Sequence, residues 1–386
     1  MTAEISFPDA DVLMDEARAA SGLTDYGDSG DLQTNLARFI EAAAREGRLD
    51  EAMARQLRGS IQQRLTNRLE IEAYYKAHPE IEAVEIGPVV SITGLPRTGT
   101  TALANIMSLE DQFRPLRSWE QTKCCPPPVA GEEARDPRRL AAVARAEWTV
   151  RNQPELAAMH LFDADTTEED VELLGMSFQA QQLALPIYSY HAWWRQADLR
   201  PAFAYHRRAL KLLQSRRPPD RWLLKAPAHV FKLDALMGAY PQAKVIMTHR
   251  DPAKVIPSNV SLVSEMHAQR GAVDPRELGR QNAEHWRIGM ERAMASRARL
   301  GEDRFFDLNH RDFVADPFGS LRRVYDFLDL ELTPATLARM QAWHAKNRSG
   351  AHGQHRYTAE QFGLTTAQLH SDFRAYIERF DVPLEA

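Results

Sequence analysis

The chain has 386 residues, of which 44% are hydrophobic and 26% charged, and its formal net charge is −5. This composition is typical of a globular protein and excludes an overall basic field for nucleic acid or an anionic membrane. A site for an anion would therefore have to be built locally, from a few residues.

The two cysteines, Cys124 and Cys125, are adjacent, a spacing that rarely allows an unstrained disulfide and that matches no metal-binding motif. The N-terminus is acidic and lacks an apolar signal segment, and no apolar run approaches the ~18 residues that span a bilayer. We therefore expect a cytoplasmic protein without a membrane span and without a nucleic-acid partner. The sequence leaves the oligomeric state open.

The first part of the chain is predicted to be helical. Residues 10–20, 32–46 and 50–77 carry apolar side chains three and four positions apart, for example Leu57 and Ile61, which is the period of an amphipathic helix. We interpret residues 1–85 as a helical N-terminal extension that caps a larger domain.

The pattern changes at Pro88. The segment 89–93 is a short β-branched apolar run, typical of a strand buried on both faces, and a glycine-bearing loop and an apolar helix pattern follow it. Strand followed by helix recurs three times, with strands at 221–225, 244–248 and 305–308 and helices at 228–240, from 252, and at 317–328. This alternation predicts an α/β fold with a P-loop-type parallel sheet flanked by helices.

That α/β domain is expected to span residues 86–386. Residues 126–220 interrupt the alternation as a mostly helical insertion. The insertion holds an aromatic cluster, Tyr188, Tyr190, Trp193, Trp194 and Tyr205. Its first four members would either line a ligand pocket or, as aromatic clusters more often do, form core.

The loop from Gly94 to Thr101 fits the P-loop skeleton G-x-x-x-x-G-x-[ST]. Its backbone N–H groups and the start of the following helix would form a nest for a phosphate. Thr100 stands where nucleotide triphosphatases have the lysine that reaches the β- and γ-phosphates, which argues against ATP or GTP hydrolysis. A cation appears earlier instead, at Arg97. The loop is therefore suited to a 5′-phosphate that carries another group.

A second phosphate site is predicted at the end of the strand 244–248. Arg250 ends a strand, Asp251 can cap the following helix, and Ser258 lies about two turns into that helix. Pro257 is expected to kink the helix and turn the Ser258 hydroxyl back toward Arg250. Two such donors converging on one point would bind a phosphate.

These two motifs, in this order, resemble those of sulfotransferases that use 3′-phosphoadenosine 5′-phosphosulfate (PAPS). Residues 95–101 resemble the 5′-phosphosulfate loop, and Arg250 with Ser258 resembles the 3′-phosphate pair. Lys225 matches the family's lysine at the end of a strand. The stretch 347–364 and the helical N-terminus are similar to a bacterial subfamily. The resemblance implies PAPS as co-substrate, bound by Arg97, Thr98, Gly99, Thr100, Thr101, Arg250, Ser258, Arg348 and Gly350.

The resemblance also implies the reaction, which moves the sulfuryl group to a hydroxyl or amine of a small or lipid-like acceptor. Arg97 and Lys225 would stabilise the charge that builds on the leaving phosphate, so that no metal is required. The sequence does not decide which residue is the general base that takes the proton of the acceptor. Glu120, which lies 23 residues beyond Arg97, matches the glutamate of the tyrosylprotein members and is the first candidate. His229 and His160 are the others.

The acidic run 167–170 is a further candidate for the base, but we interpret its carboxylates as the cap and first turn of a helix. In place of the tryptophan that stacks on adenine in many members the chain has Ala102, so that adenine contacts would come from elsewhere, with His310 a candidate. The basic loop 348–356, with Arg348 and Gly350, would close over the 3′-phosphate.

Two alternatives compete with a sulfotransferase: a P-loop kinase of small molecules, and an inactive nucleotide-binding protein.

Overall fold

The computed structural model describes residues 7–27, 31–152, 163–268, 273–347 and 357–385. The predicted site residues His160, Arg348 and Gly350 lie outside these described residues. None of the described helices is both long enough and apolar enough to cross a bilayer.

A single sheet of five parallel strands organises the molecule, in the order β2-β3-β1-β4-β5. The central strand β1 pairs with β3 on one side and β4 on the other, with Ile92 opposite both Lys225 and Ile246. The predicted parallel sheet is thus confirmed, and the carboxyl ends of its three central strands meet at one edge. The strands are β1 (Val89–Gly94), β2 (Phe113–Pro115), β3 (Arg221–Lys225), β4 (Lys244–His249) and β5 (Phe305–Asn309).

Two differences from the predicted elements have simple causes. The edge strand β2 was not predicted, because three residues are too short to show the alternation of a strand. The helix expected at 228–240 is divided into a 3₁₀ turn, η3 (Pro227–Phe231), and α11 (Leu233–Ala239), because the backbone at Lys232 (φ −141°, ψ 29°) leaves the helical region.

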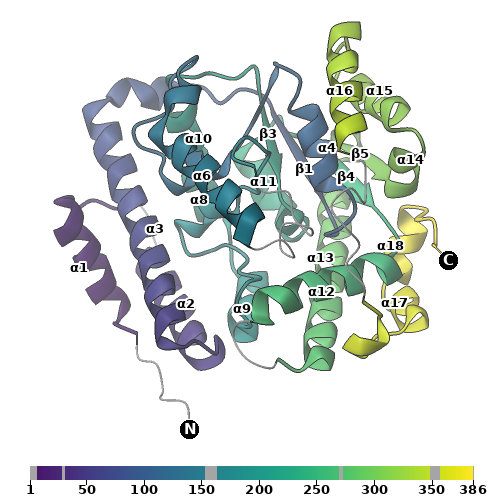
Figure 1. Cartoon of the computed structure of the whole chain (residues 1–386), viewed down its shortest axis with the longest axis horizontal. Helices are drawn as coiled ribbons and strands as arrows, with labels where there is room; N and C mark the ends of the chain where they lie inside the picture. The colour runs from purple at the N-terminus through teal and green to yellow at the C-terminus, as the bar shows by residue number, and fades with distance from the viewer. Residues whose placement is uncertain (1–6, 28–30, 153–162, 269–272, 348–356, 386) are drawn as a thin grey trace.

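The three helices predicted for the N-terminal part are present, as α1 (Ala10–Ser21), α2 (Leu32–Glu46) and α3 (Glu51–Ala77). They lie together along one side of the molecule (Figure 1), and α3 contacts α10 (Arg200–Gln214). Their buried residues belong to the same hydrophobic cluster as those of the α/β part. The domain boundaries at residues 85/86 and 126–220 stay predictions.

The remaining helices lie around the sheet, and some of them, such as α9 beside α2, pack on the N-terminal helices (Figure 1). They are α4 (Thr100–Met107), α5 (Ser118–Thr122), α6 (Pro137–Asn152), α8 (Val171–Gly175), α9 (Tyr188–Gln196), α12 (Pro252–Ala268), α13 (Pro275–Leu300), α14 (His310–Ala315), α15 (Pro317–Phe327), α16 (Pro334–Lys346), α17 (Thr366–Asp372) and α18 (Arg374–Arg379), with 3₁₀ turns η1 (Pro79–Ala83), η2 (Glu133–Arg135), η4 (Glu302–Arg304) and η5 (Glu360–Phe362).

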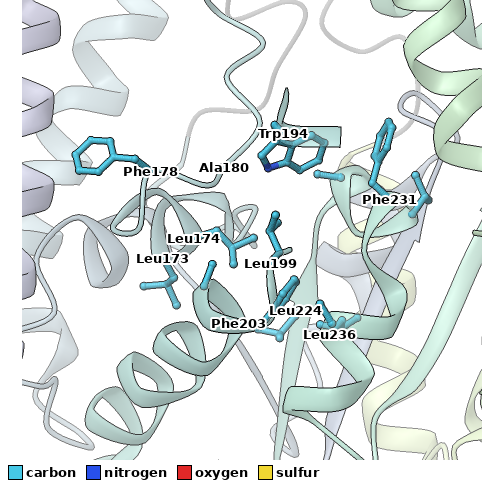
Figure 2. Packing of buried hydrophobic residues seen from close by; sticks show 14 of the residues in the cluster. Leu173, Leu174, Phe178, Ala180, Trp194, Leu199, Phe203, Leu224, Phe231 and Leu236 are labelled. Atoms are coloured by element: carbon cyan, nitrogen blue, oxygen red, sulfur yellow. The ribbon is translucent and has the colours of Figure 1, made fainter. Parts of the chain in front are cut away.

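Side chains alternate between the two faces of the sheet and are buried on both. Leu223 of β3 points into a cluster formed with α4, α15 and α16, whereas its neighbour Leu224 points into the larger cluster on the opposite face. Figure 2 shows Leu224 packed with Phe203 and Leu236 in that larger cluster, with Trp194 nearby. Burial of both faces explains why the strands read as continuous apolar runs, and it holds their ends in a fixed relation.

Candidate functional site

The loop between β1 and α4 is held in place by close contacts with β4. Gly94 has a φ of +142°, and a Cβ there would lie 2.3 Å from the Thr248 carbonyl oxygen, so no larger residue fits. The Thr98 hydroxyl donates to the Leu95 carbonyl at 2.6 Å and lies 2.6 Å from the Thr248 hydroxyl. Thr98 is therefore buried and shapes the loop from within. Gly99, with a φ of +94°, is the N-cap residue of α4 and leaves the first N–H groups of that helix without a side-chain cap.

A cavity of about 910 Å³ opens beside this loop. It is lined by the loop residues Arg97, Gly99, Thr100 and Thr101, and by Arg250 and Ser258 from the end of β4 and from α12. The two motifs that the sequence places about 150 residues apart therefore share one cavity. Arg97 has a φ of +65°, a conformation uncommon for residues other than glycine and most frequent at functional sites.

Ser258 and Arg250 both contact Arg97. Arg97 Nε donates to the Ser258 hydroxyl at 3.2 Å, and α12 continues through Pro257. Arg250 Nη1 lies 3.4 Å from the carbonyl oxygen of Arg97. Arg250 and Ser258, and Arg97 with them, line the same cavity, and their joint binding of a phosphate stays a prediction.

Two carboxylates face these cations from the insertion. Glu168 and Glu169 both line the cavity, and Glu169 Oε1 lies 3.4 Å from Nζ of Lys225, the last residue of β3. The Lys225 side chain is only 1% exposed and is not among the residues that line the cavity, so its ammonium group contacts the site through Glu169.

Asp170, the next residue, is fully buried between two imidazoles. Its carboxylate oxygens lie 3.1 Å from His206 Nε2 and 3.0 Å from His229 Nε2. Burial alone would raise the pKa of Asp170, but the two histidines hold it well below its usual range. The predicted helix is present as α8, with Asp170 at its N-cap position, but the Asp170 side chain makes no capping hydrogen bond. Asp170 instead fixes the backbone that carries Glu168 and Glu169.

Glu120 and His229, both predicted as bases, do not line the cavity. Glu120 is fully buried, with Arg114 Nη2 at 2.7 Å and the Arg117 N–H donating to it at 3.2 Å. His229 is 1% exposed and lies between the Ser91 hydroxyl, 2.9 Å from its Nδ1, and Asp170. Both side chains are therefore buried among other protein groups, and their role as bases stays a prediction.

A profile of the sulfotransferase family matches residues 88–334. The chain belongs to the sulfotransferase family. Sulfotransferase STF9 from Mycobacterium avium has a similar structure, with a TM-score of 0.90 and 28% identity over 99% of both chains. STF1 from Mycobacterium tuberculosis matches with a TM-score of 0.84 and 27% identity, over 96% of this chain and 99% of its own.

A curated relative is the omega-hydroxy-beta-dihydromenaquinone-9 sulfotransferase Stf3 of Mycobacterium bovis, 30% identical over 141 residues. The same protein of Mycobacterium tuberculosis matches equally. The aligned region spans 36% of this sulfotransferase and 36% of the relative.

Aromatic residues of α14 and α16 line the cavity of this sulfotransferase. They are Phe313 and Trp343, and His310, the candidate for contact with adenine, lines the same cavity as Ala102. Phe313 and Trp343 were missed, because they lie on helices more than 200 residues beyond the loop and nothing in the local sequence relates them to it. They are the described residues best placed to stack on a base.

Apolar residues also line the cavity. They include Leu183, Ala184, Leu262, Met266 and Trp286, and the amide-bearing Gln181 lines it with them. The aromatic cluster predicted for this role is elsewhere. Its members Tyr190 and Trp194 are buried, and they donate hydrogen bonds to the backbone carbonyls of Phe178 and Gln179. Tyr190, Trp194 and Tyr205 are thus core, whereas Tyr188 and Trp193 are partly exposed.

The charge state of His310 gives a prediction about pH. Burial, with a further contribution from the Arg250 charge, lowers the pKa of His310 to about 4. The imidazole is therefore neutral at pH 6–8. In the unfolded chain His310 takes up a proton at its ordinary pKa, which is higher than its pKa in the folded protein. The folding free energy linked to the neutral imidazole is therefore fully present above the ordinary pKa, and it is lost as the pH falls toward 4. An NMR titration, with His310→Asn to assign the signal, should give a midpoint near 4; a midpoint near 6.5 would contradict this.

Proposed function

We propose that this sulfotransferase uses PAPS as its donor and transfers the sulfuryl group to a hydroxyl of an apolar, lipid-like acceptor. The observation that carries the proposal is the convergence of the Gly94–Thr101 loop and the Arg250–Ser258 segment on one cavity. A donor with phosphates at both its 5′ and 3′ positions needs two anion sites within one pocket, and the volume of about 910 Å³ is within the range of ligand sites.

Each part of the donor has suitable partners. The N–H groups at the start of α4, with Thr100, Thr101 and Arg97, suit the 5′-phosphosulfate. Arg250 and Ser258 suit the 3′-phosphate, and Phe313 and Trp343 suit the adenine. Thr98 and Gly99 shape the loop. Arg348 and Gly350, outside the described residues, stay proposed ligands of the 3′-phosphate.

Glu169 is the general base in this proposal, in place of Glu120. The acceptor oxygen attacks the sulfur, its proton passes to Glu169, and the bond between the sulfur and the bridging oxygen of the 5′-phosphate breaks. Adenosine 3′,5′-bisphosphate leaves. Arg97, which lines the cavity, stabilises the negative charge that develops on that bridging oxygen, and Lys225, buried behind Glu169, adds positive charge at the end of β3. His229 acts indirectly, since it holds Asp170, which precedes the turn into α8.

The apolar residues that line the cavity support the class of acceptor. A hydroxyl placed at Glu169 would leave the rest of its molecule among Leu183, Leu262 and Met266. Burying apolar surface contributes roughly 25 cal/mol per Å². The relative Stf3 is named for an omega-hydroxylated menaquinone, and this agrees with an acceptor that carries a hydroxyl on an apolar body.

A thermal-shift series on the purified protein tests the donor. Adenosine 3′,5′-bisphosphate should raise the unfolding midpoint well above the shifts given by ATP with Mg²⁺, AMP or sulfate. Arg97→Ala and Arg250→Ala should each weaken bisphosphate binding by about ten- to a hundredfold, since each removes a charge-assisted hydrogen bond. A larger shift with ATP and Mg²⁺ would indicate a kinase. Bisphosphate binding without turnover of any hydroxylated acceptor would indicate an inactive nucleotide-binding protein.

A further inference from the structure

Arg250 has a second partner, on the side away from the cavity. Its Nε donates to Glu385 Oε1 at 2.8 Å and its Nη2 to Glu385 Oε2 at 3.0 Å, which is a bidentate ion pair. Arg250 lines the cavity and Glu385 does not. The carboxylate therefore holds the guanidinium from behind rather than competing for the space inside.

The chain segment that brings Glu385 to this place is firmly anchored. After α18, Phe380 stacks on His249 with ring centroids 4.3 Å apart, and Val382 is buried. The Glu385 N–H then donates to Asp251 Oδ2 at 2.8 Å. The position of Glu385 is thus set by buried apolar contacts and by a backbone hydrogen bond, independently of its own side chain.

Asp251 is a fully buried carboxylate saturated by donors. Besides the Glu385 N–H it accepts from His370 Nε2 at 2.9 Å and from the Ala253 N–H at 2.8 Å. It follows Arg250 directly in the chain. Asp251 therefore connects α17 and the segment after α18 to the end of β4 through hydrogen bonds.

The geometry of the guanidinium decides what Glu385 leaves available. Arginine presents five N–H groups in a plane, and Glu385 occupies the edge formed by Nε and Nη2. The edge formed by Nη1 and Nη2 remains, and Nη1 lies 3.4 Å from the carbonyl oxygen of Arg97, at the cavity wall. A phosphate could accept from that second edge while Glu385 keeps the first.

We infer that Glu385 is a positioning residue for the 3′-phosphate subsite: it fixes Arg250 so that the free edge of the guanidinium faces the cavity. This inference rests on the proposed donor. Arginine has a long side chain with many rotamers, and ordering it before binding removes that part of the entropic cost of binding. The negative charge of Glu385 opposes an anion only weakly, because the side chain is 30% exposed and its charge is compensated by the guanidinium that it contacts.

Isothermal titration of adenosine 3′,5′-bisphosphate and of AMP tests this. Glu385→Gln should weaken bisphosphate binding about fivefold, as expected for one side chain that must now be ordered on binding, and leave AMP binding unchanged. In the Arg250→Ala background the same substitution should have no further effect, because Glu385 acts through Arg250. Glu378→Gln, which removes an exposed carboxylate of α18, is the matched control and should bind both nucleotides as the wild type does.

Three results would overturn the inference. Unchanged or tighter bisphosphate binding by Glu385→Gln would show that the carboxylate does not position the arginine, and tighter binding would show that it competes with the phosphate. An equal loss in the Arg250→Ala background, or an equal loss for AMP, would show a general structural effect. Failure of the wild type to bind the bisphosphate would overturn the proposed donor itself, and this result is distinct from the other two.

Discussion

Replacing Glu169 by glutamine is expected to lower kcat by about 10²- to 10⁴-fold, the usual contribution of a general base. The amide would keep the size of the side chain but could not accept the acceptor's proton. Binding of adenosine 3′,5′-bisphosphate should be nearly unchanged, because the phosphate partners Arg97 and Arg250 lie elsewhere on the cavity wall. The loss would therefore appear in turnover and in single-turnover rates and not in donor affinity.

Glu168→Gln is the matched control for this prediction. Glu168 is the adjacent carboxylate and also lines the cavity, but its Oε1 accepts the Glu169 N–H at 3.0 Å, whereas the ion pair with Lys225 is made by Glu169. The Glu168→Gln variant should retain most of the wild-type kcat. Steady-state and single-turnover kinetics with a hydroxylated lipid-like acceptor would measure both variants. If Glu168→Gln lost turnover and Glu169→Gln kept it, the base would have to be reassigned to Glu168.

The central part of the fold could be predicted because its local patterns are unambiguous. Parallel strands buried on both faces give short runs of apolar and β-branched residues such as Val89–Thr93, and glycine and proline mark where each strand ends. The edge strand β2 lacks that pattern, since it has three residues. The break at Lys232 is also invisible in the sequence, because it depends on how η3 and α11 pack on α13 and α10.

The phosphate side of the site could be predicted for a related reason. Its residues lie at the ends of two adjacent strands, so short sequence motifs are enough to bring Arg97 and Arg250 to one sheet edge. The acceptor side depends on tertiary structure. Glu169 lies in an irregular segment whose position is set by the burial of Asp170 between His206 and His229, from two distant elements. Spacing from Arg97 therefore selects Glu120, although the fold places Glu120 away from the cavity.

Substitution of Glu120 is expected to lower the stability of the protein, whereas substitution of Glu169 is expected to lower its turnover. Glu120→Gln should destabilise the protein by about 3 kcal/mol, toward the lower end of the range for breaking a buried ion pair, since glutamine keeps one acceptor oxygen. The reason is Arg114, whose side chain is only 4% exposed and whose Nη2 contacts Glu120 at 2.7 Å. Without the carboxylate, the buried guanidinium of Arg114 has no negative charge beside it. Arg217, which lies 3.5 Å from the same Glu120 oxygen, also loses one of its negatively charged partners.

Urea denaturation of Glu120→Gln against the wild type would measure this, with Asp15→Asn as control, since the Arg18–Asp15 pair is exposed and should contribute little. Below its unfolding transition the Glu120→Gln variant should keep the wild-type kcat per folded molecule, because Glu120 does not line the cavity. A variant with wild-type stability and no turnover would restore Glu120 as the base and remove Glu169 from that role. The pair of substitutions thus separates a carboxylate that holds the fold from one that takes the proton.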